Sequence, residues 1–176
     1  MIGPTLTTER LILRPPAAED FEAFCAFMAE PQTKHIGGPL APEPAWRSWA
    51  VIIGAWTLNG YSMFSVIERD SGRWIGRLGP WAPLGWPAKE VGWGLIEASQ
   101  GRGYATEAAS ACMDYVFDVL GWDEVCHTIA PDNFASQKVA QRLGSTNKGP
   151  TKLPPPIDHF PVDFWGQTSD EWRARR

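Results

Sequence analysis

Cysteine is scarce in this sequence of 176 residues. The three cysteines, Cys25, Cys112 and Cys126, lie far apart, and no two of them form a Cys-x-x-Cys pair. An odd, scattered set of this kind argues against a disulfide framework and against a zinc site. Reduced cysteines are typical of a cytoplasmic protein, and we expect this chain to be one.

Histidine is equally scarce. The three histidines are His35, His127 and His159. None of them has carboxylates or cysteines at the spacing of a ligand set, so we expect no metal site. His127 precedes one of the motifs described below, yet a packing role is the better expectation for it than a role as catalytic base.

Long apolar runs and an excess of positive charge are also missing. The longest strongly apolar run, Trp49–Trp56, is far too short to cross a bilayer. The N-terminus lacks a basic start followed by an apolar block, so we expect neither a signal peptide nor a membrane partner. Sixteen Lys and Arg against twenty Asp and Glu give a net charge of −4, which argues against a nucleic-acid partner. The acidic balance mildly favours a cationic substrate.

The composition is that of one globular domain covering residues 1–176. Hydrophobic residues make up 44% of the chain and charged residues 20%, which is enough apolar material for a sizeable core. We find no internal repeat and no linker, so we expect no second domain.

The most informative stretch is a strand, a glycine-rich turn and a helix in succession. Val91–Ile96 predicts a buried strand, Glu97–Gly103 a turn, and Gly103–Leu120 a helix. Glycines allow backbone N–H groups to approach a ligand, and the helix N-terminus adds partial positive charge, so a phosphate or pyrophosphate is the expected ligand. Neither of two familiar phosphate motifs, Gly-x-x-x-x-Gly-Lys-Ser/Thr and Gly-x-Gly-x-x-Gly, is present. An ordinary strand-to-helix turn remains the alternative.

The spacing Gln100-x-x-Gly103-x-Ala105 resembles the signature of the GCN5-related N-acetyltransferases (GNAT). The phrase from Gly103 to Ala108 is similar to the branch that acetylates ribosomal-protein N-termini, which includes RimJ and RimL. In that family the turn cradles the pyrophosphate of acetyl-coenzyme A. The resemblance therefore implies acetyl-coenzyme A as co-substrate. It implies these coenzyme-binding residues: Leu95, Ile96, Gln100, Gly101, Arg102, Gly103, Tyr104, Ala105, Thr106 and Asn133.

A second segment, Ile129–Gly144, resembles the next coenzyme A motif of the family. It reads as a strand end, Pro131, Asn133, Ser136, and a helix that ends Leu143-Gly144. Asn133 also suits a helix N-cap, and the two roles are compatible. Together the two motifs place residues 5–145 within the resemblance.

The expected fold is a mixed α/β sheet of the GNAT type. We predict strands at Leu6–Arg14, Tyr61–Glu68, Arg73–Trp81, Val91–Ile96, Asp123–Ala130 and His159–Gly166. We predict helices at residues 17–30, Glu43–Leu58, Gly103–Leu120, Asn133–Leu143 and Thr168–Arg176. Short loops make the strands from Tyr61 to Ile96 antiparallel, whereas the helical crossover makes the strand Asp123–Ala130 parallel to Val91–Ile96. In the family this parallel pair splays apart and holds the pantetheine arm. Prolines after Lys148 argue against helix there, and we expect Pro150–Pro156 to be a rigid connector.

Acetyl transfer needs a neutral amine, a stabilised oxyanion and a proton for the thiolate. Glu90 is our candidate base because it begins the central strand, although a solvated Glu at a strand edge is the plain alternative. A main-chain N–H within Gly94–Ile96 would act as the oxyanion hole. Many family members use a Tyr as the acid, but this sequence has none in the second motif helix, so Ser136 is our candidate. Ser136 could equally be only a helix-start residue.

We therefore expect transfer of acetyl from acetyl-coenzyme A to a primary amine by direct attack in a ternary complex. The amine would be a protein N-terminus, a peptide amine or a small-molecule amine. A non-catalytic acyl-coenzyme A binding or sensing module is the alternative, and we allow for a homodimer. The spacing of Trp46, Trp49 and Trp56 favours core packing, with a place beside the substrate cleft as the alternative. The resemblance would place the loops Pro31–Pro44 and Trp81–Pro87 on the acceptor side together with this helix. The prediction that apolar or aromatic amines outperform polyamines assumes that placement.

Overall fold

A computed structural model describes residues 3–176, and its centre is one eight-stranded sheet. The strand order is β1-β2-β3-β4-β5-β6-β8-β7. The strands are β1 (Leu6–Thr7), β2 (Leu11–Arg14), β3 (Phe64–Glu68), β4 (Trp74–Trp81), β5 (Glu90–Leu95), β6 (Glu124–Ile129), β7 (Thr146–Thr151) and β8 (Val162–Thr168). Every neighbouring pair is antiparallel except β5 and β6, which are parallel. The predicted mixed sheet is confirmed.

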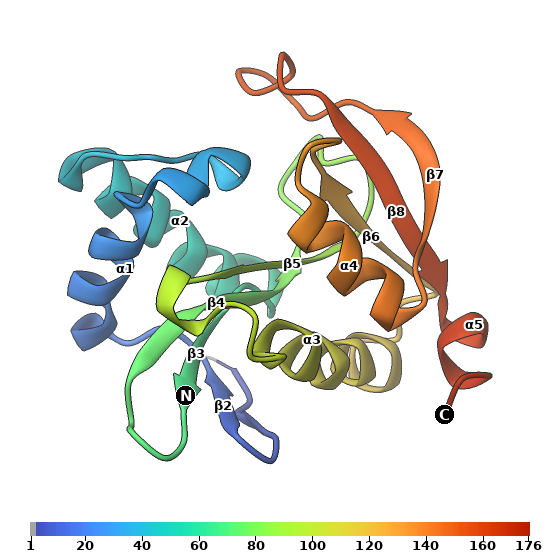
Figure 1. Ribbon diagram of the computed structural model, residues 1–176, viewed down its shortest axis with the longest axis horizontal. Coiled ribbons are helices and arrows are strands. Elements are labelled where there is room, and N and C mark those ends of the chain that lie inside the picture. The colour runs from blue at the N-terminus through green and yellow to red at the C-terminus, as the bar shows by residue number, and fades with distance from the viewer. Residues whose placement is uncertain (1–2) are drawn as a thin grey trace.

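Helices cover both faces of this sheet (Figure 1). They are α1 (Phe21–Met28), α2 (Pro42–Asn59), α3 (Tyr104–Asp114), α4 (Phe134–Leu143) and α5 (Ser169–Arg173), and α3 continues as a π-helical turn, η4 (Tyr115–Val119). Short 3-10 segments lie at η1 (Ala18–Asp20), η2 (Pro31–Ile36) and η3 (Glu97–Ser99). Helix α1 and the buried side of α2 pack with β3 and β4 in one apolar cluster, and α3 packs in a larger cluster with β2–β5.

Strands β5 and β6 separate almost as soon as they meet (Figure 1). Their only register pair is Glu90 with Cys126, and the Cys126 N–H donates to the Lys89 carbonyl at 2.8 Å. The His127 ring bridges the strands beyond this point, with Nδ1 2.6 Å from the Val91 carbonyl and Nε2 2.9 Å from Ser145 Oγ. Burial lowers the pKa of His127 to about 4, so the ring is neutral at pH 7, with Nδ1 as donor to the carbonyl. His127 is a packing residue with both ring nitrogens engaged.

Two parts of the sheet differ from the sequence prediction. The predicted strand Leu6–Arg14 is a hairpin of β1 and β2, closed by the Thr8 N–H, which donates to the Leu11 carbonyl at 2.9 Å. Strand β7 was not predicted because Pro150 interrupts it. β7 is the last strand in the sheet order, and a proline is tolerated on an edge strand because it need not donate on its free side.

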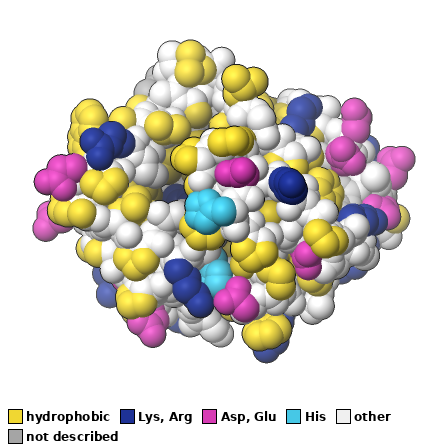
Figure 2. All heavy atoms as spheres, turned by 90° about the horizontal axis from the view of Figure 1, so that it is seen from above, with side chains coloured by type: hydrophobic (Ala, Val, Ile, Leu, Met, Phe, Trp, Pro, Cys, Tyr) yellow, Lys and Arg dark blue, Asp and Glu magenta, His cyan; other side chains and the backbone are white. Residues whose placement is uncertain are grey.

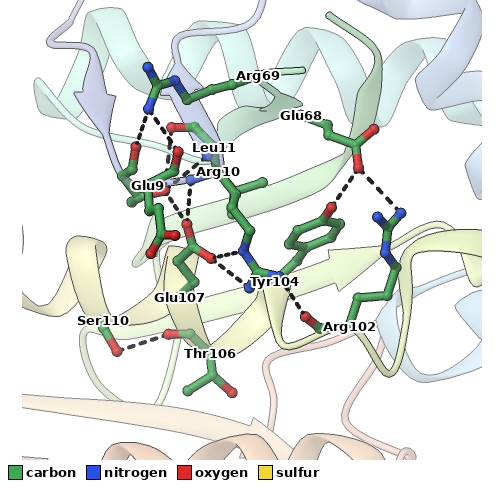
Figure 3. Close-up of polar contacts among 11 residues, drawn as sticks. Glu9, Arg10, Leu11, Glu68, Arg69, Arg102, Tyr104, Thr106, Glu107 and Ser110 are labelled. Carbon is green, nitrogen blue, oxygen red and sulfur yellow. Dashed lines mark hydrogen bonds and ion pairs between the residues drawn. The ribbon is translucent and has the colours of Figure 1, made fainter. Parts of the chain in front are cut away.

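A polar cluster fixes the start of α3 against β1 and β2 (Figure 3). The Glu107 carboxylate accepts hydrogen bonds from Thr8 Oγ1 at 2.6 Å, from the Arg10 main-chain N–H at 2.9 Å and from Arg10 Nε at 2.7 Å. The Tyr104 hydroxyl donates to Glu68 Oε1 at 2.5 Å, and Arg102 pairs with the same oxygen at 3.2 Å. These contacts hold the glycine turn from the side opposite the groove described below.

Replacing Glu107 with Gln should lower the free energy of unfolding by about 1–2 kcal/mol, because two charge-assisted bonds to the partly exposed Arg10 are weakened. Burial alone would raise the pKa of the Glu107 carboxyl, but the bonds from Thr8 and Arg10 outweigh it and lower the pKa. The difference between wild type and variant should therefore be complete above about pH 4.3, the pKa of an ordinary Glu, and shrink as the pH falls further. Urea unfolding across this range measures it. The exposed Glu9→Gln is the control, and equal stabilities for both variants at pH 7 would refute the assigned role.

Candidate active site

The glycine turn between β5 and α3 forms one wall of a groove of about 610 Å³. Gly101 and Gly103 have φ of 73° and 81°, a conformation that L side chains rarely adopt. Both line the groove, as do Gln100, Ala105 and Thr106. The start of α3 thus offers backbone N–H groups and the positive end of its dipole to the same space.

Two hydroxyls in this wall have no hydrogen-bond partner among residues 3–176. They are Ser99 Oγ and Thr106 Oγ1, both buried and both on residues that line the groove. A buried hydroxyl normally has a partner, because leaving it unsatisfied costs free energy. Lys138 and Arg142, one turn apart on α4, line the groove as well. Hydroxyl donors, glycine N–H groups and two cations suit a phosphorylated ligand.

Two residues of the predicted coenzyme set point their side chains elsewhere. The side chains of Arg102 and Tyr104 engage Glu68, and the Arg10 and Arg102 guanidinium groups both lie over the Tyr104 ring, at 4.5 and 4.7 Å. Figure 3 shows them on the β2 and β3 side of the turn. The Gln100 side chain donates to the Leu95 carbonyl at 3.1 Å and so ties the turn to the end of β5.

The N-terminus of α4 meets β5 across the groove. Asn133 caps the helix, since its side-chain oxygen accepts from the Ser136 N–H at 3.2 Å. The Trp93 indole N–H donates to Ser136 Oγ at 3.2 Å. Because the hydroxyl oxygen accepts this bond, its own proton is free to be donated. Ser136 therefore combines a free O–H with a position at a helix N-terminus, where negative charge is favoured.

Beyond the Glu90–Cys126 pair, β5 and β6 do not exchange the main-chain hydrogen bonds of a regular parallel pair. The Ile96 N–H is used within the sheet, since it donates to the Ile75 carbonyl at 3.0 Å. Main-chain groups of a strand alternate between its two edges, so the Trp93 and Leu95 N–H groups point into the gap instead. Within the predicted range Gly94–Ile96, Leu95 is thus the residue whose N–H faces the groove.

A second cavity, of about 650 Å³, lies on the far side of Trp93 and Ser136. The cavity and the groove share Trp93, Asn133 and Ser136 in their walls. Above this junction Lys34 of η2 pairs with Asp132, at 3.4 Å, so the two sides of the cleft also touch at its rim. Figure 2 shows the upper face of the molecule, where hydrophobic side chains are spread between the charged ones.

The cavity walls come from several parts of the chain. Helix α2 supplies Ser48, Val51 and Ile52, and β4 supplies Arg77 and Trp81. Strands β5 and β6, the η2 segment, the start of α4 and the segment from Leu153 to Val162 supply most of the rest. More than half of the lining residues are apolar, with Leu153, Ile157 and Phe160 on the side of the C-terminal segment.

The tryptophans of α2 do not line this cavity. Trp49 and Trp56 are buried in the core, and the Trp56 indole N–H donates to the Met63 carbonyl at 3.0 Å. Trp46 is 59% exposed on the surface. Core packing, which the spacing favours, is confirmed for Trp49 and Trp56. The alternative of a place beside the substrate is wrong for all three, because the helix turns its Ser48–Ile52 side to the cavity.

Glu90 lies at the base of the cavity and is only 7% exposed. One carboxylate oxygen, Oε2, accepts from the Trp86 indole N–H at 2.5 Å and from Thr128 Oγ1 at 2.8 Å. Burial raises the pKa of this carboxyl, and the bonds from Trp86 and Thr128 and the charge of Arg77 offset the rise only in part. Within residues 3–176, the other carboxylate oxygen, Oε1, receives no side-chain hydrogen bond. Because its side chain is buried, Glu90 is not the solvated strand-edge residue of the alternative interpretation.

Sequence reasoning missed several residues of the cavity. Trp86 orients Glu90, Trp93 orients Ser136, and Arg77 stands alone among the apolar residues of β4. A charged residue in the middle of a buried strand was the available signal for Arg77. No group of three His, Cys, Asp or Glu side chains within residues 3–176 is arranged to hold a metal ion. None of the helices in this part of the chain is long and apolar enough to cross a membrane.

Comparison with known proteins identifies the family. Residues 10–146 match the Acetyltransferase (GNAT) domain. The chain is 25% identical over 170 residues to the uncharacterized N-acetyltransferase YnaD of Bacillus subtilis (strain 168), covering 95% of this chain and 98% of YnaD. The crystal structure of an acetyltransferase from Agrobacterium tumefaciens str. C58 is 34% identical with a TM-score of 0.84, over 94% of this chain and 95% of that one.

Mycobacterium smegmatis RimJ, solved in complex with CoA-disulfide, has the same fold. The TM-score is 0.76 at 18% identity, and the match covers 96% of this chain and 88% of RimJ. At that identity the likeness concerns the fold alone. The family match over most of the sequence and the 34% identity to the Agrobacterium acetyltransferase identify the chain as an N-acetyltransferase that belongs to the GNAT family.

Proposed function

We propose that this protein transfers acetyl from acetyl-coenzyme A to a primary amine held in the cavity beneath α2. The observation that carries the proposal is the meeting of two spaces at Trp93, Asn133 and Ser136. One space has the glycine turn and the helix N-terminus suited to a pyrophosphate. The other has an apolar wall and one buried carboxylate at its base.

The groove fits the coenzyme in its donor set. The Ser99 and Thr106 hydroxyls would gain phosphate acceptors, and the N–H groups from Gly101 to Ala105 would donate to the pyrophosphate. Lys138 and Arg142 would add charge toward further phosphate. The coenzyme supplies an activated acetyl thioester, and every other role falls to side chains and main-chain groups of this chain.

Glu90 would act as the base that takes a proton from the acceptor amine. Its Oε2 is fixed by Trp86 and Thr128, which leaves Oε1 to accept from the amine. A raised pKa improves the base, because the carboxylate then holds a proton more strongly. The Leu95 or Trp93 N–H would polarise the carbonyl that is attacked.

Ser136 would donate the proton that the departing thiolate needs. Trp93 holds its oxygen, and the first turn of α4 stabilises negative charge near it. In the proposed reaction the amine loses a proton to Glu90 as the new N–C bond forms, and the thiolate gains one from Ser136 as the C–S bond breaks.

Gly103→Val should weaken acetyl-coenzyme A binding at least tenfold, because a β-branched residue does not keep the positive φ of Gly103, and the turn N–H groups proposed to donate to the pyrophosphate would then move. The positive φ of Gly103 means that the variant also loses stability through backbone strain. Gly60→Val is the matched control, since Gly60 has φ 76° at the end of α2, outside the residues that line the groove. Calorimetric titration with coenzyme A should show normal affinity for Gly60→Val alone, and equal affinities for the two variants would contradict the placement.

An amine panel tests the proposed function itself. We expect release of free thiol from acetyl-coenzyme A with aryl-alkyl amines and with peptides that begin with a hydrophobic residue, and slower release with spermidine. The cavity wall now supports this order through Val51, Ile52 and Trp81 instead of the α2 tryptophans, and Glu90 is its one buried carboxylate. Tight coenzyme binding without turnover of any amine would favour the non-catalytic module. Thiol release tenfold faster with spermidine than with the apolar amines would refute the apolar wall as the determinant of substrate choice.

Glu90→Gln should lower kcat/KM about 10²–10⁴-fold, because Gln can accept from Trp86 and Thr128 but cannot take a proton. In the wild type, kcat/KM should fall as the pH drops through the raised pKa of Glu90, above the ordinary value of about 4.3, and the variant should lack this limb. A wild-type pH profile in Glu90→Gln would remove Glu90 from the reaction.

Ser136→Ala should lower kcat with little change in coenzyme affinity. A loss of kcat below threefold would leave Ser136 as a structural residue.

A further inference from the structure

Arg77 is a half-buried cation in the acceptor cavity that the reaction described above does not use. It lies in the middle of β4 and lines the cavity beneath α2, but not the coenzyme groove. Its recorded side-chain contact is weak, Nη1 to Met63 Sδ at 3.4 Å. Within residues 3–176 the guanidinium forms no ion pair.

An arginine placed in this way lacks the partner that burial requires. Arg14, also half-buried, makes two bonds to the Asp20 carboxylate, at 2.7 and 2.8 Å. Burial lowers the pKa of Arg77 to about 10, and the negative charge of Glu90 offsets this in part, so the guanidinium stays charged at neutral pH. Desolvating a charge without a close counter-ion is costly. A counter-ion supplied by a ligand would remove that cost, and a planar guanidinium matches a carboxylate in two bonds.

The sheet places this cation and Glu90 on one surface. In the antiparallel pair of β4 and β5, Arg77 lies opposite Gly94, Gly79 opposite Gly92, and Trp81 opposite Glu90. Residues opposite one another share a face, and every second residue returns to it. Arg77 and Glu90 therefore stand at two ends of the same floor, about 13 Å apart at the backbone, before their side chains extend into the cavity.

At Gly79 and Gly92 the floor between the two charges carries no side chain of its own, and the Met63 side chain packs over it. A Cβ on Gly92 would lie 3.2 Å from Glu90 Oε1 and 3.0 Å from the Met63 side chain. A Cβ on Gly79 would meet the backbone of Ser62 and Met63 at 2.9 Å. The remaining charged groups near the cavity, Lys34, His35 and Asp132, pair with one another at its rim.

We propose that the acceptor is an amine that also carries a carboxylate, with its amine at Glu90 and its carboxylate bound by Arg77. The inference rests on the proposed function and narrows its substrate to amino acids and related amino carboxylates with an apolar or aromatic body. The apolar wall of Val51, Ile52 and Trp81 contacts that body. The coenzyme is not the partner of Arg77, since Arg77 is absent from the lining of its groove.

Two matched acceptor pairs test the proposal. L-phenylalanine is phenethylamine with a carboxylate on the carbon that bears the amine. Likewise, 4-(aminomethyl)benzoate is benzylamine with a carboxylate on the opposite side of the ring. In at least one pair the wild type should favour the acid at least tenfold in kcat/KM. Arg77→Met should lower the rate with that acid tenfold to a hundredfold, mainly through KM, and leave the uncharged amine within threefold. Arg73→Met is the control, because Arg73 is exposed just before the same strand.

Binding of the acetylated products gives a readout that does not need turnover. Calorimetry with coenzyme A present should show that N-acetyl-L-phenylalanine or 4-(acetamidomethyl)benzoate binds the wild type more tightly than Arg77→Met. Turnover of uncharged amines with no preference for either acid, or with the same preference in Arg77→Met, would overturn the inference and leave the proposed function standing. Arg77-dependent binding of an acid without turnover of any amine would support the anion site and overturn the proposed function.

Discussion

The structure depends on the separation of two parallel strands after one register pair. Parallel neighbours normally exchange evenly spaced hydrogen bonds, and buried main-chain groups that lose them need other partners. Here the His127 ring donates to the Val91 carbonyl and the Gln100 side chain donates to the Leu95 carbonyl, so these two acceptors on the open edge are satisfied from within the chain. The N–H groups on that edge, at Trp93 and Leu95, are the ones left to a ligand. The gap is therefore an edge that offers donors, which is what a thioester carbonyl requires.

Two helices begin at this gap, and their N-termini face the groove from both sides. Glycine makes the first of these starts possible, because Gly101 and Gly103 adopt positive φ on either side of Arg102. The turn is held from behind by Glu107 and Glu68, whose carboxylates bind Arg10, Arg102 and Tyr104. The charged side chains of this motif thus stabilise the turn, while its glycines and hydroxyl residues line the groove.

Sequence periodicity predicted the sheet and most of its helices, because strand alternation and helical spacing are local signals. The groove proposed for the coenzyme was predicted from two short motifs, where glycine and helix capping are also local signals.

What could not be predicted depends on contacts between residues far apart in the chain. Trp93 reaches Ser136 over 43 residues and Thr128 reaches Glu90 over 38. The Trp49 and Trp56 spacing was read correctly as a helix, yet spacing alone does not say which side of a helix faces the core and which a cavity. The Pro150 strand was missed because proline tolerance depends on being at an edge, a property of the sheet and not of the sequence.

The acceptor side is also divided along the chain in a way that bears on substrate choice. The family match ends at residue 146, whereas β8 and the segment from Leu153 to Val162 lie beyond it and complete both the sheet and one cavity wall. The groove proposed for the coenzyme and the proposed base therefore come from the matched part, and one wall of the proposed acceptor cavity comes from outside it. The floor, in contrast, belongs to β4 and β5, where Arg77 and Glu90 face a single space across two glycine positions. The attraction between Arg77 and Glu90 offsets the cost of burying each charge only in part, and each is better matched by a group on a molecule that spans them. Selectivity would then come from the spacing of those charges on rigid strands, while the C-terminal segment sets the shape of the apolar body that fits between them.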